Sequence, residues 1–312
     1  MSDDQGHKDF QRAKSISLDA ALEVGASNIR RSRQEIAENN PEFFAESAKE
    51  KLQEFTLVVC GGPRTGKSTL INAILNKDLA TVRPGFAPVT MENTCYKLDG
   101  IFPEIVDEQT GEKQQESQPF QISVWDTKGI TTWNESIVKI IREHNPMCVL
   151  LCSSPGSFAK DDFIKPLIQE CVNLNVLVAL VCTNRWNDSD IKRQRVMEEF
   201  HDLLKIYNTN IREEDGIRYY GDIGLIAMVN SVPYVNNRVG IYKPKSGVGT
   251  LLYGIMRSLS NEKLMGWCYT LMENEGFWTQ MQTHIQEFFA GKFTYGKSIL
   301  WSLSRYMTMN RK

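Results

Sequence analysis

The sequence lacks a long apolar run. Its longest apolar segments, Met147–Cys152 and Val176–Cys182, have the length of a buried strand and fall far short of the roughly 18–20 residues that cross a membrane. The start of the chain, Met1–Arg12, is polar and has no apolar signal core. We therefore expect no transmembrane helix and no secretion by a signal peptide, and we expect a cytoplasmic protein.

Patterns that hold disulfides or metals are also missing. The seven cysteines include no C-x-x-C pair, and the four histidines are scattered without metal-ligand spacing. Three of the cysteines end apolar strands. These features predict reduced, buried thiols and exclude a disulfide framework or a zinc site.

Charge of one sign is not in excess. The chain has 36 Lys and Arg residues against 38 Asp and Glu residues, a net charge of −2. Because nucleic-acid binding usually needs a basic domain, we expect no nucleic-acid partner. With 312 residues, 41% of them hydrophobic, the chain can form a substantial core, in about two domains or in one domain with appendages.

Apolar strands alternate with amphipathic helices between residues 55 and 260. The predicted strands are Phe55–Cys60, Cys95–Leu98, Phe120–Trp125, Met147–Cys152, Val176–Thr183 and Gly224–Val229. The predicted helices are Gly66–Leu75, Asn134–Glu143, Asp161–Leu174, Asp190–Tyr207 and Gly249–Ser260. This alternation predicts an α/β fold, a mostly parallel sheet with helices on both faces.

A glycine-rich segment after the first strand carries the strongest chemical signal. Gly61–Ser68 reads G-x-x-x-x-G-K-[ST], follows an apolar strand and opens a helix. In this context, backbone N–H groups and the helix N-terminus surround phosphates. We expect Lys67 to reach the β- and γ-phosphates and the Ser68 hydroxyl to ligate Mg²⁺. The segment predicts binding of a nucleoside triphosphate.

Two further segments are expected beside the γ-phosphate. Asp126–Gly129 reads D-x-x-G at the end of a strand, which would place the Asp126 carboxylate behind Mg²⁺ and the Gly129 N–H at the γ-phosphate. In nucleotide-binding proteins of this kind, a threonine between this segment and the phosphate loop, here Gly61–Ser68, commonly contacts Mg²⁺ and the γ-phosphate. Thr90 is the predicted residue, and Thr94 is the alternative.

These residues together resemble the P-loop GTPase superfamily. The resemblance covers Phe55–Ser260 and implies a Ras-like G domain at residues 55–260, with GTP or GDP as the nucleotide and Mg²⁺ as the cofactor. Outside this domain we expect a flexible segment at 1–15, a helical segment at 16–54 and a second helical segment at 261–312.

Two branches of the superfamily are similar in different segments. Arg64–Ser68 looks like the phosphate loop of guanylate-binding proteins and atlastins, in which the arginine supplies a catalytic finger within the same subunit. The segments that look like the immunity-related GTPases are Val89–Glu92, Tyr96-Lys97, Trp125-Asp126 and Gly129-Ile130. That family also has helices at both ends of its G domain. Gly247–Gly249 is common in Era-like and dynamin-like GTPases too, and the choice of branch stays open.

The base-reading loop departs from the N-K-x-D pattern of GTPases. Asn184 is placed to hydrogen-bond the base, and the aliphatic stem of Arg185 could stack where lysine normally does. Asn187 replaces the aspartate that accepts two guanine N–H groups, which could weaken guanine selection by roughly 1.5–3 kcal/mol. A shift by one residue would instead bring Asp188 into place, and a loop that reads the base badly is the third option.

Hydrolysis needs a group that completes the transition state. Ras-like enzymes carry a glutamine directly after D-x-x-G, whereas Ile130 stands at that position here. Arg64 could replace it, or could only hold phosphate in the ground state, and a partner molecule across a dimer could supply the group instead. We expect slow basal turnover that self-association accelerates, and therefore a homodimer or oligomer in the GTP-bound form.

The C-terminal segment shows two patterns. An apolar stripe with 3,4 spacing runs from Leu264 to Phe288, with Asn274 as its polar member. It predicts a helix packed as a bundle or, alternatively, a homotypic coiled coil whose register Asn274 fixes. Residues 291–312 combine five basic residues with aromatics and contain no Asp or Glu. This tail could fold against the acidic body, bind an anionic membrane surface as a peripheral anchor, or, as the third choice, bind RNA.

The sequence thus predicts a Mg²⁺-dependent GTPase that switches or self-assembles. The alternatives are a slow or inactive nucleotide-locked scaffold and a P-loop ATPase. The candidate catalytic residues are Arg64, Lys67 and Thr90, and the candidate metal ligands are Ser68, Thr90 and Asp126. The predicted nucleotide contacts are Gly61, Gly62, Pro63, Arg64, Thr65, Gly66, Lys67, Ser68, Thr69, Gly129, Asn184, Arg185, Asn187, Asp188, Asn230 and Ser231.

Overall fold

The computed structural model describes residues 52–82, 90, 92–102, 105–106, 113–115, 118–130, 135–155, 161–186 and 189–291. The flexible segment expected at 1–15, most of the helical segment expected at 16–54, and the basic tail from residue 292 onward lie outside these residues. The chain divides into two compact units. The larger unit comprises residues 54–98 and 121–271, and the smaller unit comprises residues 1–53, 99–120 and 272–312.

The fold is built on an eight-stranded sheet with the order β2-β5-β1-β6-β7-β10-β9-β8. The strands are β1 (Gln53–Gly61), β2 (Thr94–Phe102), β5 (Gln118–Asp126), β6 (Cys148–Ser153), β7 (Leu177–Cys182), β8 (Ile211–Glu214), β9 (Ile217–Tyr220) and β10 (Gly224–Met228). β1, β6, β7 and β10 pair in parallel, whereas β8, β9 and β10 pair antiparallel. The six strands predicted from the sequence are all present, and the predicted α/β fold is confirmed.

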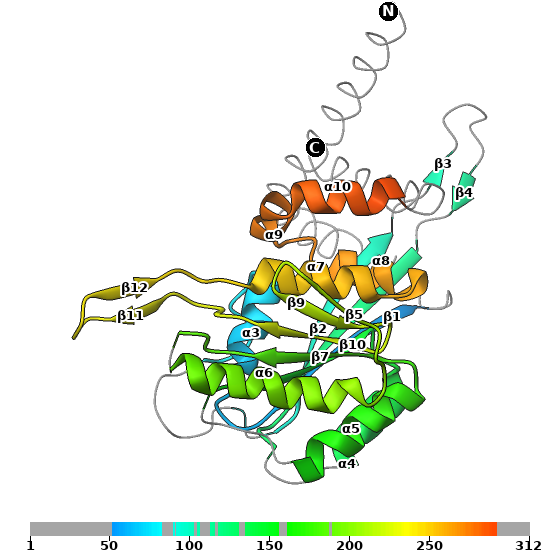
Figure 1. Ribbon diagram of the computed structural model, residues 1–312. Coiled ribbons are helices and arrows are strands. Elements are labelled where there is room, and N and C mark those ends of the chain that lie inside the picture. Colours follow the sequence, from blue (N-terminus) through cyan, green and yellow to red (C-terminus); the bar gives the residue numbers. More distant parts are fainter. Residues whose placement is uncertain are drawn as a thin grey trace, which may run out of the picture. The chain divides into compact units, whose positions relative to one another are not determined.

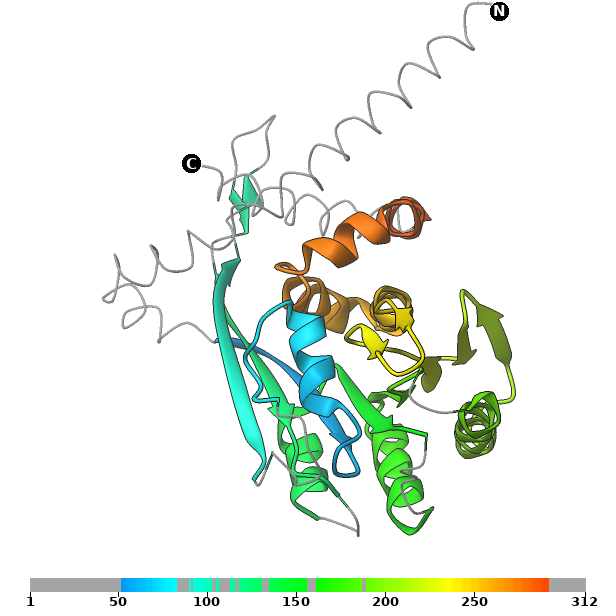
Figure 2. The same ribbon diagram turned by 90° about the vertical axis from the view of Figure 1, so that its left-hand side faces the viewer.

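Helices of the larger unit cover both faces of this sheet (Figures 1 and 2). They are α3 (Lys67–Leu75), α4 (Glu135–His144), α5 (Asp161–Asn173), α6 (Asp190–Lys205), α7 (Val248–Ser258) and α8 (Asn261–Thr270). In Figure 1, α7 and α8 lie above the sheet, and α5 and α6 lie below it. None of the helices in the described part of the chain has the length and apolar character needed to cross a membrane.

Alternating side chains of the central strands belong to opposite faces of the sheet. Val58 and Cys60 belong to an apolar cluster shared with α4, α5 and α6, and neither is accessible to solvent. Leu57 and Val59, which point to the other face, are equally inaccessible. Burial on both faces explains why these strands read as continuous apolar runs rather than as alternating ones.

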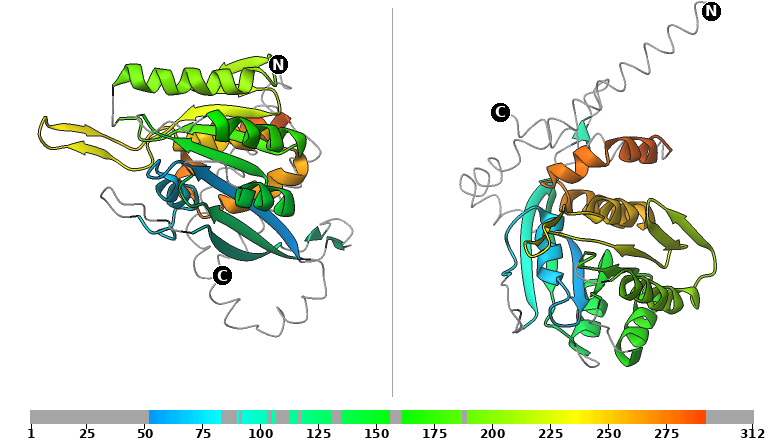
Figure 3. Two further views of the ribbon diagram at one scale, coloured as in Figure 1. Left: turned by 90° about the horizontal axis from the view of Figure 1, so that it is seen from below. Right: turned by 60° about the vertical axis from the view of Figure 1, so that its left-hand side comes forward.

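Two hairpins of the larger unit were not predicted. β8 and β9 are joined at Asp215-Gly216, and both residues have positive φ angles of 52° and 74°. An Asp-Gly pair between short strands is a standard hairpin signal that the alternation of helices and longer strands concealed. The second hairpin joins β11 (Tyr234–Asn236) to β12 (Ile241–Lys243) and extends away from the sheet (Figure 1; Figure 3, left).

The smaller unit includes the antiparallel pair β3 (Ile105–Val106) and β4 (Lys113–Gln115), and the helices α9 (Glu275–Gln280) and α10 (Gln282–Gly291). The prediction of one heptad helix over 264–288 is wrong, because α8, α9 and α10 are three separate helices. Asn274 does not fix a coiled-coil register. Its side chain accepts the Phe277 N–H at 3.1 Å and caps the start of α9. An asparagine favours such a cap over a helix interior, which explains the interruption.

Candidate functional site

The glycine-rich segment forms a tight loop between β1 and α3. Gly61 has a φ angle of 138°, and a Cβ atom there would lie 2.1 Å from the Cys152 carbonyl oxygen of the neighbouring strand. Gly66, at the start of α3, has a φ angle of 78°. Only glycine adopts such angles readily, so the sequence spacing of the two glycines sets the shape of the loop.

Lys67 lies inside this loop. Its side chain is 6% exposed, and Nζ donates to the carbonyl oxygens of Gly62 at 2.9 Å and Gly61 at 3.3 Å. Burial lowers the pKa of Lys67, although the nearby Asp126 charge acts in the opposite direction. A buried ammonium group at the mouth of a backbone loop is a site that attracts an anion.

Ser68, Thr90 and Asp126 meet beside Lys67, although they come from three distant parts of the sequence. Ser68 Oγ donates to Asp126 Oδ2 at 2.6 Å, and Thr90 Oγ1 lies 3.4 Å from both Ser68 Oγ and the same carboxylate oxygen. The alternative Thr94 is exposed, and its hydroxyl contacts the Glu92 carbonyl oxygen instead. Of the two threonines, Thr90 is therefore the one beside the proposed metal ligands.

The second oxygen of the Asp126 carboxylate, Oδ1, is buried and has no hydrogen-bond partner among the described residues. The residue is 1% exposed. Burial raises the pKa of Asp126, and the Ser68 hydrogen bond and the Lys67 charge only counter this effect. A buried carboxylate with one unpartnered oxygen, next to two hydroxyl groups, provides the oxygen donors that Mg²⁺ prefers. The residues therefore fit the expected cation.

The segment after Asp126 is held against the phosphate loop. Ile130 N–H donates to the Gly61 carbonyl oxygen at 3.0 Å. A Cβ atom on Gly129 would lie 2.5 Å from Pro63 Cα, so only glycine fits there. Ile130 itself is 5% exposed and belongs to the apolar core cluster. The position after D-x-x-G therefore contributes to the core.

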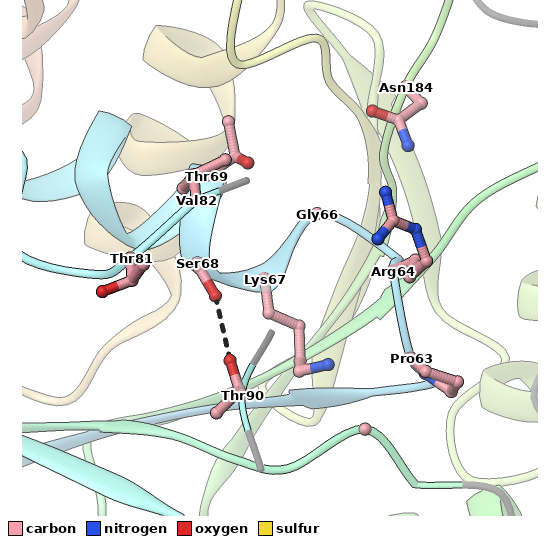
Figure 4. Close-up of a pocket in the computed structure, with 11 residues that line it drawn as sticks. Pro63, Arg64, Gly66, Lys67, Ser68, Thr69, Thr81, Val82, Thr90 and Asn184 are labelled. Atoms are coloured by element: carbon pink, nitrogen blue, oxygen red, sulfur yellow. Dashed lines mark hydrogen bonds between the residues drawn. The ribbon is translucent and has the colours of Figure 1, made fainter. Parts of the chain in front are cut away.

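These groups border a cavity of about 200 Å³. The residues that line it are Pro63, Arg64, Gly66, Lys67, Ser68, Thr69, Thr81, Val82, Thr90, Gly129 and Asn184. Arg64 is exposed and has a φ angle of 61°, and its guanidinium group is turned towards Asn184 (Figure 4). The cavity thus joins the phosphate loop to the first residue of the predicted base-reading loop.

A threonine ties these two loops together. Thr183 is 3% exposed, and its hydroxyl group lies 2.6 Å from the Thr65 carbonyl oxygen and 3.0 Å from that of Ser153. Thr65 in turn donates to the Gly62 carbonyl oxygen at 2.9 Å. Asn184, with a φ angle of 53°, follows directly and enters the cavity wall. The base-reading loop is thus fixed to the phosphate loop at its first residue.

The rest of the base-reading loop is partly described. Arg185 N–H donates to the Val229 carbonyl oxygen at 3.2 Å, and its guanidinium lies 4.8 Å from the centre of the Trp186 ring. The choice between Asn187 and Asp188 stays a prediction, because both residues lie outside the described part of the chain.

Asn230, in the segment expected to contact guanine O6, is held by backbone and side-chain hydrogen bonds. Asn230 N–H donates to the Ser246 carbonyl oxygen at 2.8 Å, and the Asn230 side chain donates to the Val232 carbonyl oxygen. The guanine contact of Asn230 and Ser231 stays a prediction.

Sequence reasoning missed several residues that shape the site. Asn93 accepts the Lys128 N–H at 3.0 Å and thereby connects the Thr90 segment to the D-x-x-G segment. Thr81 and Val82 line the cavity although no motif includes them. The buttressing role of Thr183 had a weak signal, since it immediately precedes Asn184 at the end of a buried strand.

Part of the chain is similar to a known protein family. Residues 56–184, less than half of the chain, match a protein-family model described as 50S ribosome-binding GTPase. Within these residues the chain is similar to GTPases of the P-loop superfamily. No curated protein sequence matches it significantly. The narrower resemblance to immunity-related GTPases and guanylate-binding proteins stays a prediction.

Several solved structures show a low degree of similarity to the chain. Elongation factor SelB from Methanococcus maripaludis is 12% identical with a TM-score of 0.34, covering 58% of this chain and 30% of its own. Toc33 from Arabidopsis thaliana, a dimerization-deficient mutant, is 15% identical with a TM-score of 0.35, covering 61% of this chain and 76% of its own. A bacterial selenocysteine-specific elongation factor is 15% identical with a TM-score of 0.39, covering 67% and 30%. The chain thus spans about a third of each elongation factor.

Proposed function

We propose that this protein binds GTP together with Mg²⁺ and hydrolyses it to GDP and phosphate. The observation that carries the proposal is the unpartnered Asp126 Oδ1, which lies buried beside the Ser68 and Thr90 hydroxyl groups and next to the phosphate loop. A buried carboxylate oxygen without a hydrogen-bond partner is costly unless a ligand binds it. The family match over residues 56–184 supports guanine nucleotide as that ligand.

Each residue of the site has a distinct part in this proposal. Lys67 would exchange its bonds to the Gly61 and Gly62 carbonyl oxygens for bonds to phosphate oxygens. Ser68, Thr90 and Asp126 would hold Mg²⁺, which offsets phosphate charge when bound. Because Ser68, Thr90 and Asp126 lie next to one another, catalysis would require little reorganisation of these groups.

Hydrolysis additionally needs a group at the γ-phosphate that Ile130 does not supply. Arg64 is the candidate, because it belongs to the phosphate loop itself and lines the cavity. Its guanidinium group would have to turn from Asn184 towards the phosphates to act. We propose that nucleotide binding, or self-association of GTP-bound molecules, brings about this change. A slow, nucleotide-locked scaffold is the second candidate, and the burial of Ile130 in the core favours it.

The proposal is tested by nucleotide competition and phosphate release with the purified full chain. GTP, ATP and XTP are each used to displace a fluorescent GTP analogue from the protein, with Mg²⁺ and with EDTA. We expect GTP to displace the analogue at the lowest concentration, and we expect this preference only when Mg²⁺ is present. Phosphate release should be measured over a range of protein concentrations. A per-molecule rate that rises with concentration supports self-association, and a flat, low rate supports the scaffold.

Lys67→Ala provides the decisive variant, because it removes the buried ammonium group that the phosphates would contact. It should abolish GTP binding. Lys263→Ala is a matched control, since Lys263 Nζ also donates to carbonyl oxygens, of Pro146 at 3.1 Å and Asn175 at 3.3 Å. GTP affinity like that of the wild type in Lys67→Ala, or preference for ATP in the wild type, would refute the proposal.

A further inference from the structure

The β11–β12 hairpin is an extension that the nucleotide site does not use. Its root is closed by the paired Asn230 and Ser246, which exchange two backbone hydrogen bonds of 2.8 and 2.9 Å. Gly247 follows with a φ angle of 76°, and a Cβ atom there would lie 2.3 Å from the Met228 carbonyl oxygen. The root is therefore fixed to the end of β10, while the hairpin itself projects from the larger unit (Figure 1; Figure 3, left).

The hairpin exposes an unusual amount of apolar side chain. The exposed fractions are 56% for Val235, 63% for Val239, 42% for Ile241 and 64% for Tyr242. Val235 lies directly opposite Tyr242, so these two side chains share one face. Ile241 pairs with Asn236 and belongs to the other face, which leaves apolar groups on both sides of the ribbon. An isolated two-stranded hairpin is only marginally stable in water. Apolar side chains exposed on such a hairpin therefore indicate that a binding partner covers them.

The charge of the hairpin is of one sign. Between residues 231 and 247 the basic residues are Arg238, Lys243 and Lys245, and the segment contains no Asp or Glu. All three basic side chains are exposed. In a symmetric hairpin-to-hairpin contact, a second copy of the chain would bring the same three cations, and the like charges would repel. Single-stranded RNA would use basic and aromatic groups but not the exposed valines and isoleucine.

We propose that the β11–β12 hairpin docks on an anionic lipid bilayer. Aliphatic side chains that enter the boundary of the acyl chains, a tyrosine at the headgroup level and flanking cations are the combination that such a surface binds. Val239, in the turn between the two strands, would enter most deeply, and Tyr242 would lie at the headgroup level. Arg238 and Lys245 would contact the anionic headgroups.

The third cation connects the hairpin to the base-reading loop. Lys243 Nζ lies 5.6 Å from the centre of the Trp186 ring, which also carries the Arg185 guanidinium at 4.8 Å. Such contacts contribute modestly at exposed sites, but here they join β12 to the loop that begins at Asn184. The lipid-binding element would thus be held beside the nucleotide pocket, and this placement does not depend on whether the pocket hydrolyses GTP.

The test is sedimentation of the full chain with vesicles of phosphatidylcholine alone or mixed with phosphatidylserine. The wild type should bind only the mixed vesicles, and less tightly as salt is raised. Val239→Asp combined with Tyr242→Asp should weaken binding by at least about tenfold, because it replaces the apolar contact with two carboxylates. Arg238→Gln with Lys245→Gln should weaken it by about fivefold per cation, since each contributes about 1 kcal/mol.

Ile206→Asp is the matched control, because Ile206 at the end of α6 is 64% exposed, as Tyr242 is. It should bind vesicles as the wild type does. All variants should retain the thermal midpoint of the wild type, which shows that they are folded. Wild-type binding by both hairpin variants would overturn the proposal and assign any lipid affinity to another part of the chain. The proposal would also be overturned if the wild type failed to bind mixed vesicles at low salt. It would likewise be overturned if the hairpin variants lost self-association or poly(U) binding but kept vesicle binding.

Discussion

Replacement of Asp126 by asparagine should have opposite effects on the ligand-free and the ligand-bound protein. Asparagine has nearly the same shape and keeps an oxygen that can accept the Ser68 hydroxyl group. It removes the charge that the proposed cation would need. If Asp126 is a metal ligand, the substitution should leave the ligand-free protein at least as stable as the wild type and should abolish stabilisation by Mg²⁺ and GTP.

The magnitudes follow from the surroundings of the carboxylate. Asp126 is 1% exposed, and its Oδ1 atom has no partner among the described residues. The asparagine NH2 group in the same place would also lack a partner, so the substitution recovers only the excess cost of burying the charge, about 1–3 kcal/mol. The substitution also weakens the 2.6 Å hydrogen bond from Ser68, because its acceptor changes from a charged carboxylate oxygen to a neutral amide oxygen. This loss is about 1 kcal/mol. Asp126→Asn should therefore change the ligand-free stability by about 0 to +2 kcal/mol. At about 2–4 °C per kcal/mol, the thermal midpoint should rise by up to about 8 °C.

Thermal unfolding, monitored with EDTA and then with Mg²⁺ and GTP, measures both effects. At a GTP concentration of about 100 times Kd, the wild type should gain about 2.7 kcal/mol, and Asp126→Asn should gain less than about 1 kcal/mol. Asp202→Asn is a suitable control, because Asp202 pairs with Lys205 on the surface and should affect neither measurement appreciably. If Asp126→Asn destabilises the ligand-free protein by more than about 2 kcal/mol, the carboxylate is a structural link between Ser68 and Thr90, and the reasoning fails.

Three further substitutions test other parts of the site. Arg64→Ala should lower kcat by at least about tenfold with little change in GTP affinity, as expected for a contact made in the transition state; unchanged kcat at every protein concentration would exclude Arg64 as the finger. Gly129→Ala, whose Cβ atom would lie 2.5 Å from phosphate-loop backbone, should cost about 1–3 kcal/mol of stability and weaken GTP binding, whereas Gly276→Ala, whose Cβ atom would meet Asn274 Oδ1 at an ordinary 3.9 Å, should do neither. Thr183→Val removes the hydroxyl group 2.6 Å from the Thr65 carbonyl oxygen and should cost about 1–2 kcal/mol in chemical denaturation; a neutral effect would show that the two loops need no such link.

The sheet of the larger unit was predictable because its central strands are buried on both faces. Continuous apolar runs such as Met147–Cys152 and Val176–Thr183 leave little choice of structure, and turn residues separate them from the amphipathic helices. The short strands β8, β11 and β12 are partly or fully exposed, whereas β9 is mostly buried but only four residues long, and all four strands carry mixed polar and apolar residues. Their alternation is too short to be separated from loop sequence, although Asp215-Gly216 does mark a turn.

The C-terminal stripe shows how periodicity fails where a single polar residue decides. Spacing of apolar residues from Leu264 to Phe288 is compatible with one long helix, and the stripe alone contains no reason to stop. The Asn274 side chain instead satisfies the Phe277 N–H and begins a new helix. Whether an asparagine lies on a helix surface or caps a helix depends on tertiary packing, which a periodic pattern does not contain.

The candidate site was predictable where a motif fixes the backbone and not where contacts are long-range. Gly61–Ser68 defines its own loop through two glycines of positive φ, so Lys67 and Ser68 could be assigned roles from the sequence. The meeting of Thr90 with Asp126 could be inferred only through the family resemblance. Asn93 and Thr183, which connect segments far apart in the sequence, belong to no motif.

The burial of Ile130 constrains where the missing hydrolytic group can come from. Ile130 N–H is bonded to the Gly61 carbonyl oxygen, and its side chain lies in the core cluster with residues of α4 and α5. A polar side chain at this position would enter an apolar environment instead of reaching the γ-phosphate, at a cost of about 1–3 kcal/mol without a partner. The difference from Ras-like enzymes is therefore one of direction as well as residue type. Under the proposed function, a water-orienting or charge-stabilising group would have to come from another residue of the cavity wall, such as Arg64, or from another molecule.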